Sequence, residues 1–441
     1  MPLERNEFKT RLKSAKSFMH SSSISRLYFI NSTTFSLWWI ALNPGFYSAD
    51  SIGVLNRVAN GELSSEWTYL WDVLVYVFTI GGVYPHFGTL AFGLILVFSF
   101  TFFCVSFFAI RTAWLVSILV SNTPIVFGLG LTLWHDVPMT SGLLLFTASI
   151  KRTLDTGRLN LGIFLVSFIL VNTRLNGFWT ALFTLLILVS IKRISIRPFI
   201  KMTIYLVLVT APATILNYVN LTNENTQISG LTHWMKYDIS CYISGESRSK
   251  LEIEEKLIRE NLTPRDLVSA SACNWFMDPN ALASWSSANS ESIVRTWMLL
   301  FRSDGLSILK IHENRAEYLI FNPFRIPSKP PFLHTTIESE NPWVREWNPT
   351  AYQIARSYPR FWNAIYPLTA YAGFWLFFIF IITLRNSKYF PILVLSTVLN
   401  TSIFITAIIA DVRYVAFTLI AGVAIALAEL CKYVPKRLKQ N

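Results

Sequence analysis

The chain has 441 residues, of which 52% are hydrophobic and only 15% charged, and its formal net charge is +12. Several apolar runs approach the ~20 residues that a helix needs to cross ~30 Å of hydrocarbon. An excess of positive charge also occurs in nucleic-acid-binding proteins, but in a membrane protein the positions of the charges carry the information. The composition therefore predicts an integral membrane protein and excludes nucleic acid as its partner.

The first apolar run, residues 27–42, follows a polar and basic segment, residues 1–26. The basic segment is expected in the cytoplasm, and because the run lacks a small-residue cleavage site it is predicted to be a retained transmembrane helix. The first outer loop then covers residues 43–85. Within it, residues 69–80 are apolar but too short for a span and contain Asp72, which favours an interfacial or re-entrant helix.

Nine more apolar runs predict the remaining spans, which gives ten with the first helix. They cover residues 86–110, 113–133, 137–150, 161–171, 178–191, 199–218, 366–384, 390–410 and 414–430. When the chain alternates from a cytoplasmic N-terminus, every turn assigned to the inside is basic, and the one acid in those turns is Asp155, in agreement with the positive-inside rule. The predicted fold is an all-α polytopic membrane protein with about ten transmembrane helices. It has an N-terminal module (27–218), C-terminal helices (366–430) and a cytoplasmic basic tail (431–441).

Residues 219–365 form the largest predicted outer loop, a mixed extracytoplasmic cap with charges of both signs and many tryptophans. Its aromatic side chains suit a folded cap resting on the interface, and the alternative is that they stack on sugar rings. Cys241 and Cys273 fall in this cap, where an oxidising compartment would allow them to pair. Cys104 and Cys431 are expected to be small core residues of the spans.

Polar residues gather at the predicted outer ends of the spans. Asp50 follows the Pro44-Gly45 turn after the first helix, and residues 134–136, 172–177 and 411–414 lie at the ends of later spans. Ionisable groups at membrane depth are costly, so these sets are expected to face one another or a shared cavity. Each one could instead be an interfacial charge that anchors a helix end. The middles of the spans lack acids and bases, which argues against an ion-coupled transporter.

Two carboxylates and two arginines at an outer membrane surface suit glycosyl transfer from a lipid-carried donor, because nucleotide sugars are cytoplasmic. The leaving group is then a phosphate, which Arg174 or Arg413 could neutralise through bidentate contacts. Asp50 is the first choice for the general base that takes the acceptor proton. Asp136 could orient the acceptor, ligate a divalent cation or act as the base. His135 could bind a sugar hydroxyl or a phosphate oxygen, and the alternative is an interfacial imidazole.

These motifs resemble those of the GT-C superfamily of polyprenyl-phosphate-sugar-dependent glycosyltransferases, which includes protein O-mannosyltransferases and lipid A aminoarabinose transferases. Residues 43–51 resemble the acidic first outer loop of these enzymes, and residues 134–138 resemble their second acidic segment. Residues 173–177 are similar to the Arg-x-Asn-Gly turn of some bacterial members, and residues 411–414 to an Arg-Tyr that opens a late helix. Asp50 stands alone where the mannosyltransferases have adjacent acids. The resemblance implies an inverting transferase with catalytic carboxylates and a binding set of His135, Arg174, Asn176, Arg413 and Tyr414.

Four residues at the edges of the predicted cap are secondary site candidates, namely His233, Asp238, Arg356 and Arg360. They lie where the cap must meet the spans. A solvated or structural role is the alternative for each. No Cys/His spacing in the chain resembles a zinc site.

The expected partners are a polyprenyl-phosphate-linked sugar donor, membrane lipids and an extracytoplasmic acceptor, which is a glycan, a lipid or a protein. A divalent cation, Mg²⁺ or Mn²⁺, held by Asp50 and Asp136 is left open as a cofactor. The bacterial cytoplasmic membrane is the expected location, with the endoplasmic reticulum as the alternative. Two other classes stay open, a transporter or flippase of lipid-linked glycan precursors and a receptor or assembly scaffold.

Overall fold

The described part of the chain is built from helices. The computed structural model describes residues 3–42, 45, 47, 49–63, 68–191, 194, 196–221, 230–243, 290–316, 372–406 and 412–432. All secondary-structure elements in these ranges are helical, which confirms the predicted all-α fold.

The N-terminal half contains the elements of the predicted N-terminal module. The first five helices are α1 (Leu3–Ala41), α2 (Ala49–Ala59), α3 (Tyr69–Phe78), α4 (Pro85–Phe107) and α5 (Ile110–Ser121). A short π-helix (Pro124–Gly128) follows, and then α6 (Asp136–Thr156), α7 (Leu161–Val171), α8 (Leu175–Ser190) and α9 (Ile196–Leu221).

The remaining elements belong to the predicted cap and to the C-terminal helices. The described cap helices are α10 (Gly230–Ile243) and α14 (Ser290–Ala316). The C-terminal elements are α18 (Ala372–Arg385), a 3₁₀-helix (Ser387–Tyr389), α19 (Phe390–Thr406), a second 3₁₀-helix (Val412–Val415) and α20 (Ala416–Leu430).

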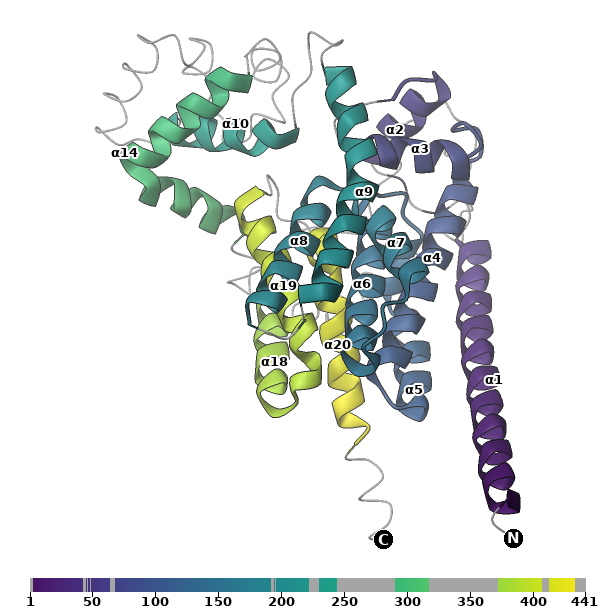
Figure 1. Cartoon of the computed structure of the whole chain (residues 1–441). Helices are drawn as coiled ribbons and strands as arrows, with labels where there is room; N and C mark the ends of the chain where they lie inside the picture. The colour runs from purple at the N-terminus through teal and green to yellow at the C-terminus, as the bar shows by residue number, and fades with distance from the viewer. Residues whose placement is uncertain are drawn as a thin grey trace.

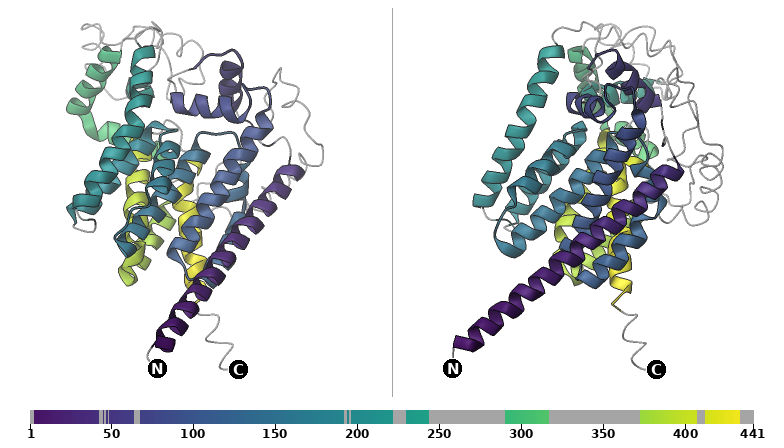
Figure 2. Two further views of the ribbon diagram at one scale, coloured as in Figure 1. Left: turned by 45° about the vertical axis from the view of Figure 1, so that its right-hand side comes forward. Right: turned by 90° about the vertical axis from the view of Figure 1, so that its right-hand side faces the viewer.

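The long helices form a bundle with distinct ends (Figure 1). α2, α3, α10 and α14 lie at one end, and the start of α1 and the end of α20 lie at the other. Inside the bundle α4 packs on α6 and α6 on α7, while α18 packs on both α19 and α20. α1 contacts α4 and α5, and its N-terminal part extends past the bundle (Figure 2).

α6 is the central helix, because every residue from Asp136 to Ile150 is buried. Gly142 makes its contact with α7 possible. A Cβ at this position would lie 2.6 Å from the backbone nitrogen of Val171, so any larger side chain would push the two helices apart. The sequence therefore places a glycine where two backbones approach most closely.

One predicted span is wrong. Residues 113–133 do not form one helix, because α5 ends at Ser121 and the chain continues through a π-helix and an extended segment. Pro124 cannot donate a backbone hydrogen bond to a continuing helix. The two residues before it also compete for helical carbonyls, since Asn122 Nδ2 donates to Ile118 O at 2.8 Å and Thr123 Oγ1 donates to Val120 O at 2.7 Å.

Two helices of the described chain are long and apolar enough to cross a membrane, judged by length and composition, namely Pro85–Phe107 and Ser387–Ile405. Six other apolar helices have 10–17 residues. At 1.5 Å per residue such helices reach only about 15–25 Å, less than the ~30 Å hydrocarbon core. The count of ten spans therefore stays a prediction.

The described cysteines are of two kinds, one in a disulfide and two free. Cys241 of α10 is disulfide-bonded, and Cys273, its predicted partner, lies outside the described residues. Cys104 and Cys431 are free, and Cys104 is buried inside α4. The described cysteine that forms a disulfide therefore lies in the predicted cap.

Candidate functional site

The centre of the site is a buried ion pair between Asp136 and Arg174. Asp136 opens α6 and is fully buried, and its Oδ1 accepts a hydrogen bond from Nη1 of Arg174. Arg174 directly precedes α8, and its side chain keeps 12% of its surface exposed. The ring of Tyr414 lies 3.9 Å from the guanidinium carbon, at cation–π distance. Arg174 therefore contacts two other predicted site residues, Asp136 and Tyr414, which are distant from it in sequence.

His135 adds a fourth predicted residue to this cluster. It is buried, and its Nε2 lies 3.8 Å from Oδ2 of Asp136. Its ring faces the edge of Trp71, with 6.1 Å between the ring centroids. The backbone oxygen of His135 accepts a hydrogen bond from Thr173 Oγ1 at 3.1 Å. The segment before α6 and the turn before α8 are thus joined by the hydrogen bond from Thr173 to a backbone oxygen and by the ion pair between the side chains of Asp136 and Arg174.

The predicted Arg-x-Asn-Gly turn owes its shape to Gly177. A Cβ at this position would lie 2.1 Å from the backbone oxygen of Val171, so only glycine allows the turn to fold back on the end of α7. The backbone nitrogen of Gly177 donates to Arg174 O at 3.0 Å, which closes the turn. Asn176, the remaining predicted residue of this turn, is half-buried in the first turn of α8. The glycine therefore positions Arg174 beside α6.

Asp50 lies at the start of α2, and the next residue, Ser51, contacts the segment that leads to α6. Asp50 is partly exposed in the first turn of α2. Ser51 is buried, and its hydroxyl donates to Leu133 O at 2.8 Å, in the segment that leads to Asp136. Gly45 approaches the same segment, since a Cβ there would lie 2.7 Å from Leu131 O and its φ is +101°. The predicted turn after the first helix thus brings the start of α2 to the site.

A second ion pair, between the partly exposed Arg57 and the buried Asp72, lies in the predicted first outer loop. Nη2 of Arg57 in α2 lies 3.6 Å from Oδ1 of Asp72 in α3, and Asp72 is fully buried. Trp71, the residue next to Asp72, contacts His135. The sequence prediction assigned Asp72 to a short interfacial helix but did not include this pair in the site. The one available signal was a carboxylate within an apolar run.

Asp238 lies in a different cluster, where α10, α14 and α19 meet. Its Oδ2 is 3.0 Å from Nε2 of His312 and accepts a hydrogen bond from the indole of Trp297 at 2.8 Å. Nδ1 of His312 lies 3.1 Å from Phe404 O, so this histidine joins the cap helices to the end of α19. Trp234 packs edge-on against Trp297 with centroids 5.0 Å apart. These contacts support the structural alternative for Asp238 and for the cap tryptophans.

Several predicted residues are not fully described. His233 lies in α10 and Arg413 in the second 3₁₀-helix, but their side chains are outside the described set. Asp411, Arg356 and Arg360 lie outside the described residues altogether. Within the described chain no group of three or more His, Cys, Asp or Glu side chains has an arrangement that could hold a metal ion.

Comparisons with family models, with curated proteins and with solved structures give no match. The resemblance of residues 173–177 and 411–414 to GT-C motifs stays a prediction from the sequence.

Proposed function

We propose that the protein is an integral-membrane glycosyltransferase of the GT-C type, which moves a hexosyl or pentosyl group from a polyprenyl-phosphate donor to an extracytoplasmic acceptor. One observation carries the proposal. Arg174 contacts Asp136 and Tyr414 from distant segments, and the segment that leads to α6 contacts the start of α2, which holds Asp50. Buried ionisable groups cost free energy, so their convergence favours a functional site over separate helix anchors.

The proposal places ten helices in the membrane, with both termini in the cytoplasm of a bacterial cell. Outward-facing apolar side chains support it, for example Leu208 on α9, which is 61% exposed, and Phe377 on α18, which is 64% exposed. Helices shorter than the hydrocarbon core fit where the bilayer thins or flanking residues reach the headgroups. The disulfide at Cys241 suits an oxidising side for α10, at the end opposite the start of α1 and the end of α20.

Arg174 is proposed to bind the phosphate of the lipid donor. A guanidinium has five N–H donors, and in this structure Asp136 accepts from Nη1 while Tyr414 covers one face. Other donors then serve phosphate oxygens at the exposed edge of Arg174, where a phosphate leaving group needs neutralisation. Asp136 acts here as the residue that positions Arg174, and Arg413 would add a second cation.

Asp50 is proposed as the general base. Asp50 is partly exposed in the first turn of α2, whereas Asp136 is fully buried in its pair with Arg174, so an acceptor hydroxyl can reach Asp50 more readily. The acceptor oxygen forms its bond to the anomeric carbon as the bond from that carbon to the phosphate oxygen breaks. Asp50 takes the hydroxyl proton, and the bonding electrons leave with polyprenyl phosphate, so configuration inverts in one displacement. His135 and Asn176 would contact sugar hydroxyls, and a divalent cation at the carboxylates is left to experiment.

The test is sugar transfer by the purified protein in nanodiscs with a panel of polyprenyl-phosphate sugars and a broad acceptor mixture. Asp50→Asn should lower the rate of polyprenyl-phosphate release by about 10²–10⁴-fold while donor binding is retained. Asp155→Asn is the matched control, because this exposed carboxylate lies at the opposite end of the bundle. An EDTA arm followed by Mg²⁺ or Mn²⁺ tests the cation.

Two results would redirect the assignment. Donors that bind but are never consumed, in any acceptor mixture, would favour the flippase or transporter class. Full activity of Asp50→Asn with loss in Asp136→Asn would move the base to Asp136.

A further inference from the structure

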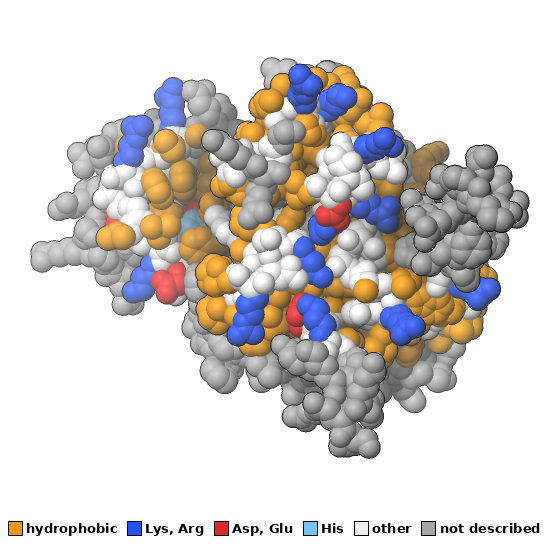
Figure 3. All heavy atoms as spheres, turned by 60° about the horizontal axis from the view of Figure 1, so that its bottom comes forward, with side chains coloured by type: hydrophobic (Ala, Val, Ile, Leu, Met, Phe, Trp, Pro, Cys, Tyr) orange, Lys and Arg blue, Asp and Glu red, His pale blue; other side chains and the backbone are white. Residues whose placement is uncertain are grey.

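The end of the bundle opposite α2 and α3 carries a basic surface, which we call the basic end face. Figure 3 shows Lys and Arg side chains spread over this end among hydrophobic ones. The face consists of the charged residues at the helix ends between α4 and α7 and between α18 and α20. It has seven bases and two acids among the described residues: Arg111, Lys151, Arg152, Arg158, Arg385, Lys388 and Lys432, with Asp155 and Glu429.

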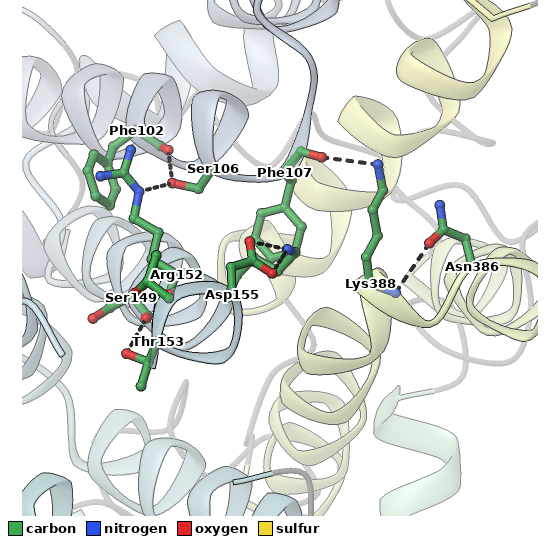
Figure 4. A network of polar contacts seen from close by, with 11 residues as sticks. Phe102, Ser106, Phe107, Ser149, Arg152, Thr153, Asp155, Asn386 and Lys388 are labelled. Carbon is green, nitrogen blue, oxygen red and sulfur yellow. Dashed lines mark hydrogen bonds and ion pairs between the residues drawn. The ribbon is translucent and has the colours of Figure 1, made fainter. Parts of the chain in front are cut away.

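Two of these bases are used inside the protein (Figure 4). The guanidinium of Arg152 lies 4.3 Å from the ring centroid of Phe102, and its Nε donates to Ser106 Oγ at 3.1 Å. Nζ of Lys388 donates to Phe107 O at 3.1 Å, at the carboxyl end of α4, where the helix dipole favours a cation. Arg152 and Lys388 therefore hold α6 and the 3₁₀-helix before α19 against the end of α4.

Two more bases are neutralised by neighbours on their own helix. Lys151 pairs with Asp155 one turn further along α6. Lys432 pairs with Glu429 at the end of α20. The two acids of the face are thus both engaged by nearby lysines.

The three remaining bases, Arg111, Arg158 and Arg385, are exposed and make no ion pair with any described residue. Two exposed leucines lie at helix ends of the same face. Leu384 is 70% exposed and precedes Arg385 in sequence, and Leu430 at the end of α20 is 61% exposed. The face therefore combines arginines that make no ion pair with a described residue and leucines whose side chains are largely exposed.

We propose that the basic end face binds the headgroups of anionic phospholipids. Guanidinium groups match phosphate oxygens bidentately, and a leucine one residue away can enter the acyl region beneath the same headgroup. A free polyanion such as a nucleic acid would leave these leucines in water, so the exposed leucines favour a lipid surface. The inference concerns the end opposite the glycosyltransferase site and does not rest on sugar transfer.

The test compares phosphatidylglycerol with phosphatidylcholine added to the purified full chain in neutral detergent. Bound lipids are counted by native mass spectrometry, and inorganic phosphate and heparin serve as headgroup-free competitors. The variant is Arg158→Gln/Arg385→Gln. Its matched control is Arg302→Gln/Lys310→Gln, which removes the same charge from exposed positions on α14 at the other end of the bundle.

We expect the parent to prefer phosphatidylglycerol and to lose this preference in high salt, because exposed charges are screened. Each arginine near an anionic surface contributes about fivefold in affinity, so the variant should bind phosphatidylglycerol about 25-fold more weakly while the α14 control is unchanged. The salt series on the parent decides the question if the variant fails to fold. Equal binding of the two lipids, an equal loss in the control, or displacement of the lipid by heparin or phosphate would each overturn the proposal.

Discussion

The two ends of the helix bundle both concentrate charge, but they hold it differently. At the site end, Asp136 is fully buried and pairs with Arg174 from a separate helix. At the basic end face, Asp155 is 51% exposed and pairs with Lys151 on its own helix. The buried pair joins distant parts of the sequence, whereas the exposed pair joins residues one turn apart.

The difference follows from desolvation. Burying an ion pair removes two charges from water, and the gain in Coulomb energy often fails to offset that cost. Such pairs are therefore a weak device for stability, and their presence favours a functional or positioning role. An exposed pair on a helix contributes only about 0.3–0.5 kcal/mol and is screened by salt. Variants at the two ends should consequently behave very differently.

The largest expected effect is at the buried pair. Arg174→Ala leaves the Asp136 carboxylate buried without its guanidinium and should lower the free energy of unfolding by about 3–5 kcal/mol. Lys151→Ala at the other end is the control and should cost less than about 0.5 kcal/mol. The measurement is unfolding by SDS titration in mixed micelles. A double variant, Asp136→Ala/Arg174→Ala, should recover part of the loss; equal losses for Arg174→Ala and Lys151→Ala would contradict the comparison.

The same substitution, glycine to alanine, can be made at both ends of the bundle. Gly177→Ala places a Cβ 2.1 Å from Val171 O and should destabilise by about 1–3 kcal/mol, because the turn that carries Arg174 must shift. Gly162→Ala, in the first turn of α7, meets its nearest atom at 3.8 Å and should stabilise by about 0.5–1 kcal/mol, since alanine favours a helix. Thermal unfolding monitored by tryptophan fluorescence gives both values. The same sign for both variants would show that the close approach at Gly177 is unimportant.

A third comparison uses two lysines. Burial in α10 lowers the pKa of Lys236 to about 8 from its usual 10.5. Between these values the unfolded chain binds more protons than the folded one, so stability should rise with pH. Burial raises the pKa of Tyr242 to about 12, which opposes this trend only above pH 10.0. Lys236→Met should raise the melting temperature at pH 8 and flatten its rise between pH 8 and 10, as measured by a pH series of thermal melts.

The control for this titration is Lys432→Met. Lys432 is 49% exposed at the basic end face, so removing it should leave the pH dependence between pH 8 and 10 in place. A flattened curve in Lys432→Met, or an unchanged one in Lys236→Met, would show that burial of Lys236 is not the cause.

Local sequence signals predicted part of the fold. Residues 161–171 were predicted as a helix, and α7 has the same bounds, because Asn160 Oδ1 accepts from Ile163 N at 3.3 Å and caps its start. The predicted span at 113–133 failed because hydrophobicity does not distinguish a helix from an apolar segment interrupted at Pro124. Composition indicates where a chain is apolar, whereas helix-capping residues and prolines indicate where a helix begins or ends.

For the site, the predicted topology placed Asp136, Arg174 and Tyr414 at the same end of the bundle, because every second helix end lies on the same side. The structure shows that Arg174 contacts both other residues. The pair between Arg57 and Asp72 was missed. It depends on how α2 packs on α3 within the predicted first outer loop, and no periodic pattern in the sequence encodes that packing. Contacts within the long helices are therefore predictable by register, whereas contacts between short helices in a loop are not.

The smallest expected effect is the salt dependence of the ion-pair coupling energy, which should differ between the two ends of the bundle. A double-mutant cycle on Lys151 and Asp155 should give a coupling of at most about 0.5 kcal/mol at low ionic strength, and this coupling should vanish in 1 M NaCl, where the Debye length is about 3 Å. The same cycle on Asp136 and Arg174 should give a larger coupling that salt barely changes, because Asp136 is fully buried. A salt-sensitive coupling at Asp136 would mean that water and ions reach this carboxylate, and Asp136 would then compete with Asp50 for the role of general base.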